Sequence, residues 1–170
     1  MFKLLGAALI VTGASSVGIR MALRVRQEEQ LLRSIVRVLE LWRCEIGSSL
    51  TPTVQLCELA AGICKGMLKD VFTAAAQRMA LQEDADAGAV MEAVLLRFGS
   101  RLPLSCICRL RELGSILGAY DAQQQTQALE ALIARVNCSV DELRSGAAER
   151  CRSYEVMGVC AGCALAIILL

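Results

Sequence analysis

The stretch QEEQLLRSIVRVLELWRCEI, residues 27–46, decides the fold class of this chain. Its large apolar residues recur at intervals of three and four positions: Leu32, Ile35, Leu39, Trp42 and Ile46. This interval matches one side of an α-helix, because 3.6 residues complete each turn. Charged residues occupy the positions between them. The stretch therefore predicts an amphipathic helix with one buried side.

The same helical repeat continues through the rest of the central region. Apolar residues at this spacing predict five more helices, in residues 52–64, 68–79, 91–98, 103–118 and from 121 onward. Sustained alternation typical of strands is absent, and aromatic residues make up only 4% of the chain. We therefore expect an all-α protein in which short loops join about six helices into an antiparallel bundle.

Small and cap-forming residues mark the expected helix boundaries. Gly47 ends the first helix, and Thr51 with Pro52 begins the second, as N-cap and first helical residue. Residues 62–66, which start and end with glycine, break the chain before the third helix, and residues 82–87 form an acidic loop. Gly118 is expected to cap the fifth helix and Asp121 to cap the sixth.

Both ends of the chain are apolar. Hydrophobic residues make up 55% of the sequence although 21% is charged, because no charge occurs in residues 4–19 or 156–170. A spanning helix needs about 20 residues, with about 17 as a lower limit, so both runs are short. We predict terminal transmembrane helices at 1–19 and 156–170 and a cytoplasmic helical domain at 20–155.

Arginines set the expected orientation of these segments. Six lie on the central side of the two runs, and only Lys3 lies on the other side; the six are Arg20, Arg24, Arg26, Arg144, Arg150 and Arg152. The positive-inside rule then places the central region in the cytoplasm and both termini outside. A cleaved signal peptide and a buried helix of a soluble protein are competing interpretations of the first run.

The composition also limits the chemical functions that the chain can have. The region between Arg20 and Glu155 has no net charge, so nothing in it favours nucleic acid.

Nine cysteines with two prolines and no histidine indicate reduced, buried thiols. Cys160 and Cys163 have the spacing of a metal or redox pair, but a four-ligand zinc site lacks partners and helix packing is the simpler explanation. We find no catalytic motif and expect no enzyme and no cofactor.

The order of features along the whole chain resembles the stage III sporulation protein AB family. The resemblance rests on Lys3–Ala7, Leu39–Leu41, Glu45-Ile46, Thr51-Pro52, Leu113-Gly114, Leu117-Gly118, Asp121, Gln125, Tyr154, Gly158 and Gly162. It marks as motif positions Glu45, Thr51, Pro52, Gly118, Asp121 and Gln125, with Gly158 and Gly162 for packing of the membrane helices. Ser48 and Met91 depart from the family, which usually carries tyrosine and tryptophan there.

The resemblance implies a function that composition does not supply. The family's soluble part is similar to the cytoplasmic domains of the type II secretion platform protein (GspF). By this likeness the chain is a non-enzymatic scaffold of the SpoIIIA–SpoIIQ assembly, on the mother-cell side in the outer forespore membrane. Expected partners are a secretion-type ATPase, stage III sporulation protein AA, and other SpoIIIA membrane proteins; a homo-oligomer is compatible with this.

Two other functions compete with the scaffold. The first is a membrane protein that senses metal or redox state through Cys160 and Cys163. The second is a secreted helical protein released after signal cleavage. For the scaffold, the exposed positions Arg33, Arg37 and Glu40 are a candidate contact surface, although a charged helix side is commonly just solvated.

Overall fold

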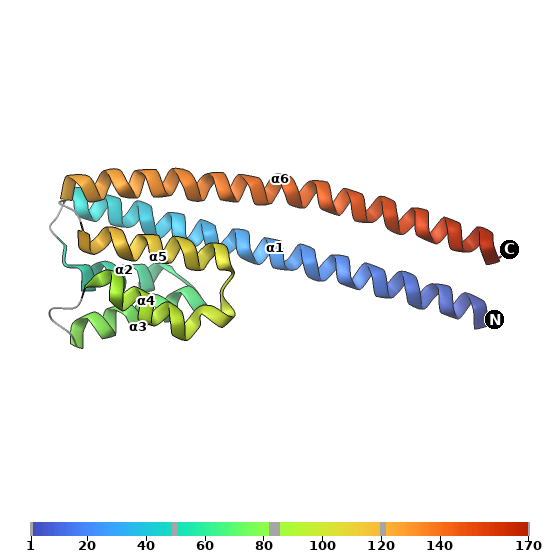
Figure 1. Ribbon diagram of the computed structural model, residues 1–170, viewed down its shortest axis with the longest axis horizontal. Helices are drawn as coiled ribbons and strands as arrows, with labels where there is room; N and C mark the ends of the chain where they lie inside the picture. Colours follow the sequence, from blue (N-terminus) through green and yellow to red (C-terminus); the bar gives the residue numbers. More distant parts are fainter. Residues whose placement is uncertain (1, 49–50, 82–85, 120–121, 170) are drawn as a thin grey trace. The chain divides into compact units, whose positions relative to one another are not determined.

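The computed structural model is helical throughout the part of the chain that it describes. It describes the backbone of residues 2–48, 51–81, 86–119 and 122–169, and the side chains of residues 23–47, 51–81, 86–117 and 123–146. Over these residues there is no strand, and the elements are α1 (Phe2–Ser48), α2 (Thr53–Ile63), α3 (Met67–Leu81), α4 (Ala87–Phe98), the 3-10 turn η1 (Gly99–Arg101), α5 (Leu104–Ala119) and α6 (Ala122–Leu169) (Figure 1). The prediction of an all-α chain with six helices is confirmed.

The chain divides into two compact units. The bundle unit comprises residues Gln30–Val140, and the terminal unit comprises Met1–Glu29 with Asp141–Leu170. α1 and α6 each contribute to both units without interruption. Residues 20–46 contain neither glycine nor proline, so no helix breaker interrupts α1 between the two units. The second continuous helix passes Gly146, which does not end it.

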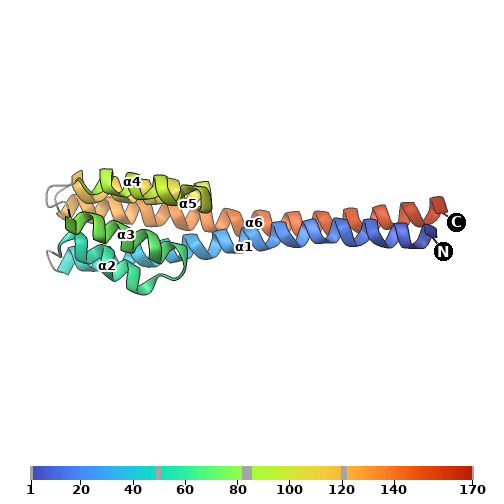
Figure 2. The same cartoon turned by 90° about the horizontal axis from the view of Figure 1, so that it is seen from below.

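In the bundle unit α2 packs against α3, α3 against α4 and α4 against α5 (Figures 1 and 2). An ion pair between Arg43 and Glu130, at 3.3 Å, joins α6 back to α1. All six helices supply large side chains to the core, and no polar or charged residue is buried among those described. The largest buried side chains are Leu32, Ile35, Leu39, Trp42, Leu56, Leu68, Phe72, Met91, Leu110, Leu113, Leu129 and Leu132. Burial of apolar surface therefore holds the six helices together.

The start of α2 differs from the prediction. Thr53 is its first residue, and Pro52 precedes it as the N-cap in an extended conformation, with φ −58° and ψ 145°. Thr51 is not the cap, because its hydroxyl group donates to the carboxylate of Glu45 and does not accept from the helix. A carboxylate is a strong acceptor, which explains why this hydrogen bond forms.

The loops between α2 and α5 follow the sequence more closely. Gly66, with φ +58°, lies in the break between α2 and α3, where a side chain would be strained. Residues 82–85 of the predicted acidic loop lie outside the described residues. Asp86 caps α4 by accepting from the backbone N–H of Gly88 at 3.3 Å. α4 begins at Ala87, so that last residue of the predicted loop is helical.

The predicted cap of α5 is wrong. Gly118 lies inside the helix, which continues to Ala119, so it is not the residue that ends it. Alanine has the highest helix propensity and extends the last turn. Asp121, the expected cap of α6, lies outside the described residues.

In the terminal unit the first part of α1 and the last part of α6 lie side by side and run antiparallel (Figures 1 and 2). Glu29 and Arg144 form an ion pair between them, at 3.2 Å. Within the residues whose side chains are described, no helix is long and apolar enough to cross a membrane. The predicted spans at 1–19 and 156–170 lie outside those residues, and they stay predictions.

Candidate functional site

Three of the family-motif positions lie at the corner between α1 and α2. Thr51 Oγ1 donates to Glu45 Oε2 at 3.2 Å, and both side chains are half-buried. Pro52 follows, and its carbonyl group accepts the first hydrogen bond of α2 from Leu56 N at 3.1 Å. The spacing of Glu45 and Thr51 thus has a physical basis: one hydrogen bond sets the direction in which the chain leaves α1.

The buried side chain of Trp42 also joins α1 to α2 at this corner. Its indole Nε1 donates to the carbonyl oxygen of Leu56 at 2.8 Å, and its ring meets Phe72 edge to face with centroids 5.8 Å apart. A buried indole N–H needs such a partner. Helical spacing predicted that Trp42 faces inward, but the bond to Leu56 requires knowledge of how α2 packs on α1.

The corner between α5 and α6 holds another motif position. Gln125 Nε2 donates to the carbonyl oxygen of Leu117 at 3.1 Å. This carbonyl belongs to the last turn of α5, where carbonyl groups have no partner within the helix. A side chain from α6 therefore caps α5. Leu117 and Gln125, two positions of the family resemblance, are thus in direct contact.

These two corners lie at the same end of the bundle unit, where α1 ends and α6 begins (Figure 1). We call this the turn end, residues 45–52 and 117–125. The structure thus brings five motif positions, which are up to 80 positions apart in the chain, to one end of the bundle unit: Glu45, Thr51, Pro52, Gly118 and Gln125. The predicted packing positions Gly158 and Gly162 lie in the terminal part of α6, outside the described side chains.

α4 and α5 approach closely at Gly114. A β-carbon at this position would stand 2.7 Å from Met91 Cβ and 3.6 Å from Gly88 Cα. Real β-carbon contacts do not reach the first distance, so only glycine fits. Met91 is itself fully buried. The Leu113-Gly114 pair of the family pattern therefore reflects a close packing contact between two helices.

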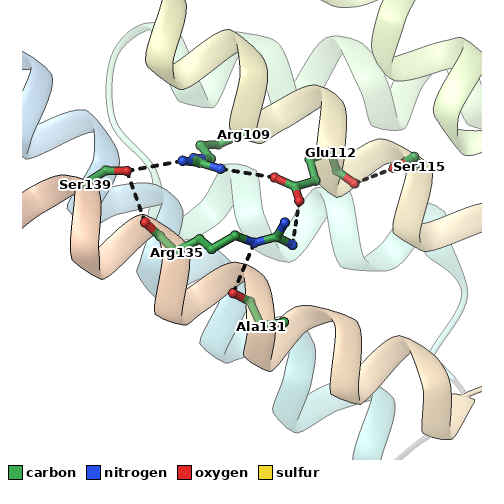
Figure 3. A network of polar contacts seen from close by, with 6 residues as sticks. All are labelled: Arg109, Glu112, Ser115, Ala131, Arg135 and Ser139. Atoms are coloured by element: carbon green, nitrogen blue, oxygen red, sulfur yellow. Dashed lines mark hydrogen bonds and ion pairs between the residues drawn. The ribbon is translucent and has the colours of Figure 1, made fainter.

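A polar network joins α5 to α6 (Figure 3). We call Arg109, Glu112, Arg135 and Ser139 the arginine network. Arg109 contacts Glu112 Oε2 through Nη1 at 3.3 Å and donates through Nη2 to Ser139 Oγ at 3.2 Å. Arg135 Nη2 contacts the other oxygen, Glu112 Oε1, at 2.5 Å. One carboxylate thus bridges two guanidinium groups from different helices.

Further bonds to the backbone orient these side chains. Arg135 Nε donates to the carbonyl oxygen of Ala131 at 3.4 Å, and Ser139 Oγ donates to that of Arg135 at 3.1 Å (Figure 3). Arginine stays protonated in proteins, so neither guanidinium group of the network can act as a base at neutral pH. The network therefore serves to hold α5 against α6. Sequence reasoning missed it because its members lie up to 30 positions apart.

A separate ion pair joins α4 to α5 at the surface. Arg111 donates to Glu92 through Nε at 2.6 Å and through Nη2 at 2.8 Å. These hydrogen bonds lower the pKa of the Glu92 carboxyl group and raise the pKa of the Arg111 guanidinium. The pair is exposed and two-pronged, so it positions α5 more than it stabilises it.

Of the described thiols, Cys57, Cys64 and Cys106 are buried as predicted, whereas Cys44, Cys108 and Cys138 are exposed. Burial, with a smaller contribution from Glu58, raises the pKa of Cys57 to about 12, and its sulfur lies 3.9 Å from Met79 Sδ. Burial also raises the pKa of Cys64, against the opposing charge of Arg37. Both therefore stay protonated at neutral pH. Over the described part of the chain no three metal-binding side chains cluster, and Cys160 and Cys163 lie outside it.

Fold and contacts together define a helical-bundle protein whose polar groups join helices to one another. Residues 3–170 match the family described as stage III sporulation protein AB, and the chain belongs to this family. Membership gives the protein a role in sporulation. The resemblance noted from the sequence is confirmed.

A solved structure shows the same fold. A protein described as stage III sporulation protein AB (SpoIIIAB) matches with a TM-score of 0.64 and 17% identity, over 72% of this chain and 97% of that one. At this identity the likeness shows the fold alone. No curated protein matches the chain.

Proposed function

We propose that the protein is a non-enzymatic membrane scaffold of the SpoIIIA–SpoIIQ assembly between mother cell and forespore. In this proposal residues 1–19 and 156–170 anchor the chain in the outer forespore membrane. The bundle unit faces the mother-cell cytoplasm and docks a secretion-type ATPase, stage III sporulation protein AA. Membership of the stage III sporulation protein AB family supports this role.

The observation that carries the proposal is the continuity of α1 and α6. Each is one helix from an apolar chain end to the core of the bundle unit, over 47 and 48 residues. Two such helices suit a scaffold, since each carries the chain from an apolar end into the bundle unit without a break in its helical hydrogen bonds.

The surface of the bundle unit offers a charged contact region. Arg33 and Arg37 are exposed on α1, and Arg37 Nη2 donates to Ser34 Oγ at 2.7 Å. Glu40 is exposed one turn further. Exposed charges set the rate and specificity of association more than its strength. We assign this region, Arg33 to Glu40, to the contact with the ATPase.

Binding of purified full-length protein in detergent micelles to the ATPase tests the proposal. We expect measurable binding, and a loss of roughly tenfold when Arg33→Glu and Arg37→Glu are combined, because two charges reverse. Lys65→Glu with Lys69→Glu is the matched control, since these two lysines are equally exposed and lie on other segments of the unit. Absence of binding by the full-length protein, in micelles and in membranes, would contradict the docking role.

A further inference from the structure

The charges of the terminal unit are sorted into layers. The Glu29–Arg144 ion pair sets the register of α1 against α6. Because the helices are antiparallel, moving back along α1 from residue 29 to 20 corresponds to moving forward along α6 from residue 144 to 153. Residues at corresponding positions of the two segments therefore lie at the same height along the pair.

Basic residues occupy the layer next to the apolar ends. Residues 20–26 and 147–153 hold five arginines against one glutamate, which leaves a charge of +4; they are Arg20, Arg24, Arg26, Arg150, Arg152 and Glu149. Arg24 and Arg26 are exposed. One further charge, Glu155, precedes the second apolar run. A patch of this charge attracts anions over about a Debye length, roughly 8 Å at physiological salt.

Acidic residues occupy the next layer. Residues 28–29 and 141–144 hold four carboxylates against one arginine, which leaves a charge of −3: Glu28, Glu29, Asp141, Glu142 and Arg144. At a rise of 1.5 Å per residue the basic layer is about 10 Å deep, close to the depth of a headgroup region. The first acidic residue of α1 follows the apolar run by roughly 13 Å. The carboxylates thus stand beyond the headgroups.

We propose that residues 20–26 and 147–153 form a basic belt that binds the phosphates of anionic phospholipids. This inference rests on the membrane anchoring in the proposed function and adds a lipid preference to it. If the charges of both layers were mixed at one height, they would hardly attract a phosphate, because +4 and −3 nearly cancel. Their separation by height leaves a net charge of +4 at the level of the phosphates, while the four carboxylates of the acidic layer lie farther from the membrane.

Lipid association of the full-length protein in phosphatidylcholine vesicles tests the belt. Trace spin-labelled phosphatidylglycerol or spin-labelled phosphatidylcholine reports, by electron paramagnetic resonance, the fraction of each lipid held at the protein. We expect the anionic lipid to be preferred by on the order of fivefold at low salt. At 1 M salt, where the Debye length is about 3 Å, the ratio should approach one.

Two quadruple variants identify the residues responsible. R24Q/R26Q/R150Q/R152Q should bring the ratio close to one, whereas R33Q/R37Q/K65Q/K69Q, which removes as many exposed charges from the bundle unit, should leave it unchanged. Equal association of both lipids with the inserted wild-type protein, or an unchanged ratio in the first variant, would overturn the belt. Release of the wild-type protein from vesicles by alkaline carbonate would instead overturn the anchoring, and the belt with it.

Discussion

The two sides of α5 are held in different ways. Toward α4 the backbones approach so closely that Gly114 cannot carry a β-carbon. Toward α6 the contact is made by the long side chains of the arginine network, which remain about one quarter to one half exposed. Close packing excludes water and leaves no room for adjustment, whereas charged side chains near the surface are mobile and screened. Changes on the α4 side should therefore cost much more stability.

The largest effect should come from the buried side chain at this contact. Met91→Ala removes a fully buried side chain and should lower the free energy of unfolding by about 3 kcal/mol. Chemical denaturation of the full-length protein in micelles, followed by circular dichroism, measures this. Met67→Ala is the control, because Met67 is only half-buried at the start of α3. Equal losses in the two variants would contradict the packing assigned to Met91.

Gly114→Ala should have the next largest effect. Its new methyl group meets Met91 at 2.7 Å, so we expect a loss of about 2 kcal/mol although alanine favours helices. Gly62→Ala on α2 introduces the same methyl group with no atom within 4 Å, and it should leave stability unchanged or higher. If the same denaturation assay shows Gly114→Ala to be neutral, then α4 and α5 can separate without cost.

On the α6 side, Glu112→Gln removes the carboxylate shared by Arg109 and Arg135. The guanidinium groups lose their common partner, and we expect stability to fall by about 1 kcal/mol because the network is partly exposed. Glu130→Gln, at the more exposed pair with Arg43, should cost less. A loss above that of Gly114→Ala would reverse the ranking of the two sides.

The smallest effect concerns Glu92 and its dependence on pH. Hydrogen bonds from Arg111 lower the pKa of Glu92 in the folded protein, so its stabilisation is present above the unfolded value of 4.5 and is lost as the pH falls through the lower folded value. Glu92→Gln should therefore be slightly less stable than wild type at pH 7, and the two should converge in more acidic solution. A difference that persists well below pH 4.5 would point to a non-ionic cause.

The sequence alone predicted the helices and their inner sides well. The three- and four-residue spacing of Leu32, Ile35 and Leu39 is repeated in the observed burial, since local periodicity determines which side of a helix is apolar. The residues at which the helices begin and end were harder to predict. Pro52 and Gly118 are compatible with several boundary positions, and tertiary contacts such as the bond between Thr51 and Glu45 decide among them.

Contacts between distant residues could not be predicted in the same way. Nothing in the local sequence shows that Gln125 caps α5 or that Ser139 meets Arg109, because these bonds depend on the packing of two helices. For the turn end, the resemblance to a family marked the positions without explaining them. The structure adds a partner for Glu45, Thr51 and Gln125, while the role of Asp121 stays a prediction.

The apolar core has a consequence for divergence. No polar or charged residue is buried among the described residues of the bundle unit, so apart from Trp42, whose indole N–H donates to Leu56, no core position there must retain a strong hydrogen-bond partner. Leucine, isoleucine, methionine and valine can then replace one another where total volume is kept. Such a core lets related sequences drift far apart while the fold persists. We therefore expect strict residue requirements mainly at close contacts such as Gly114, where geometry tolerates one residue type.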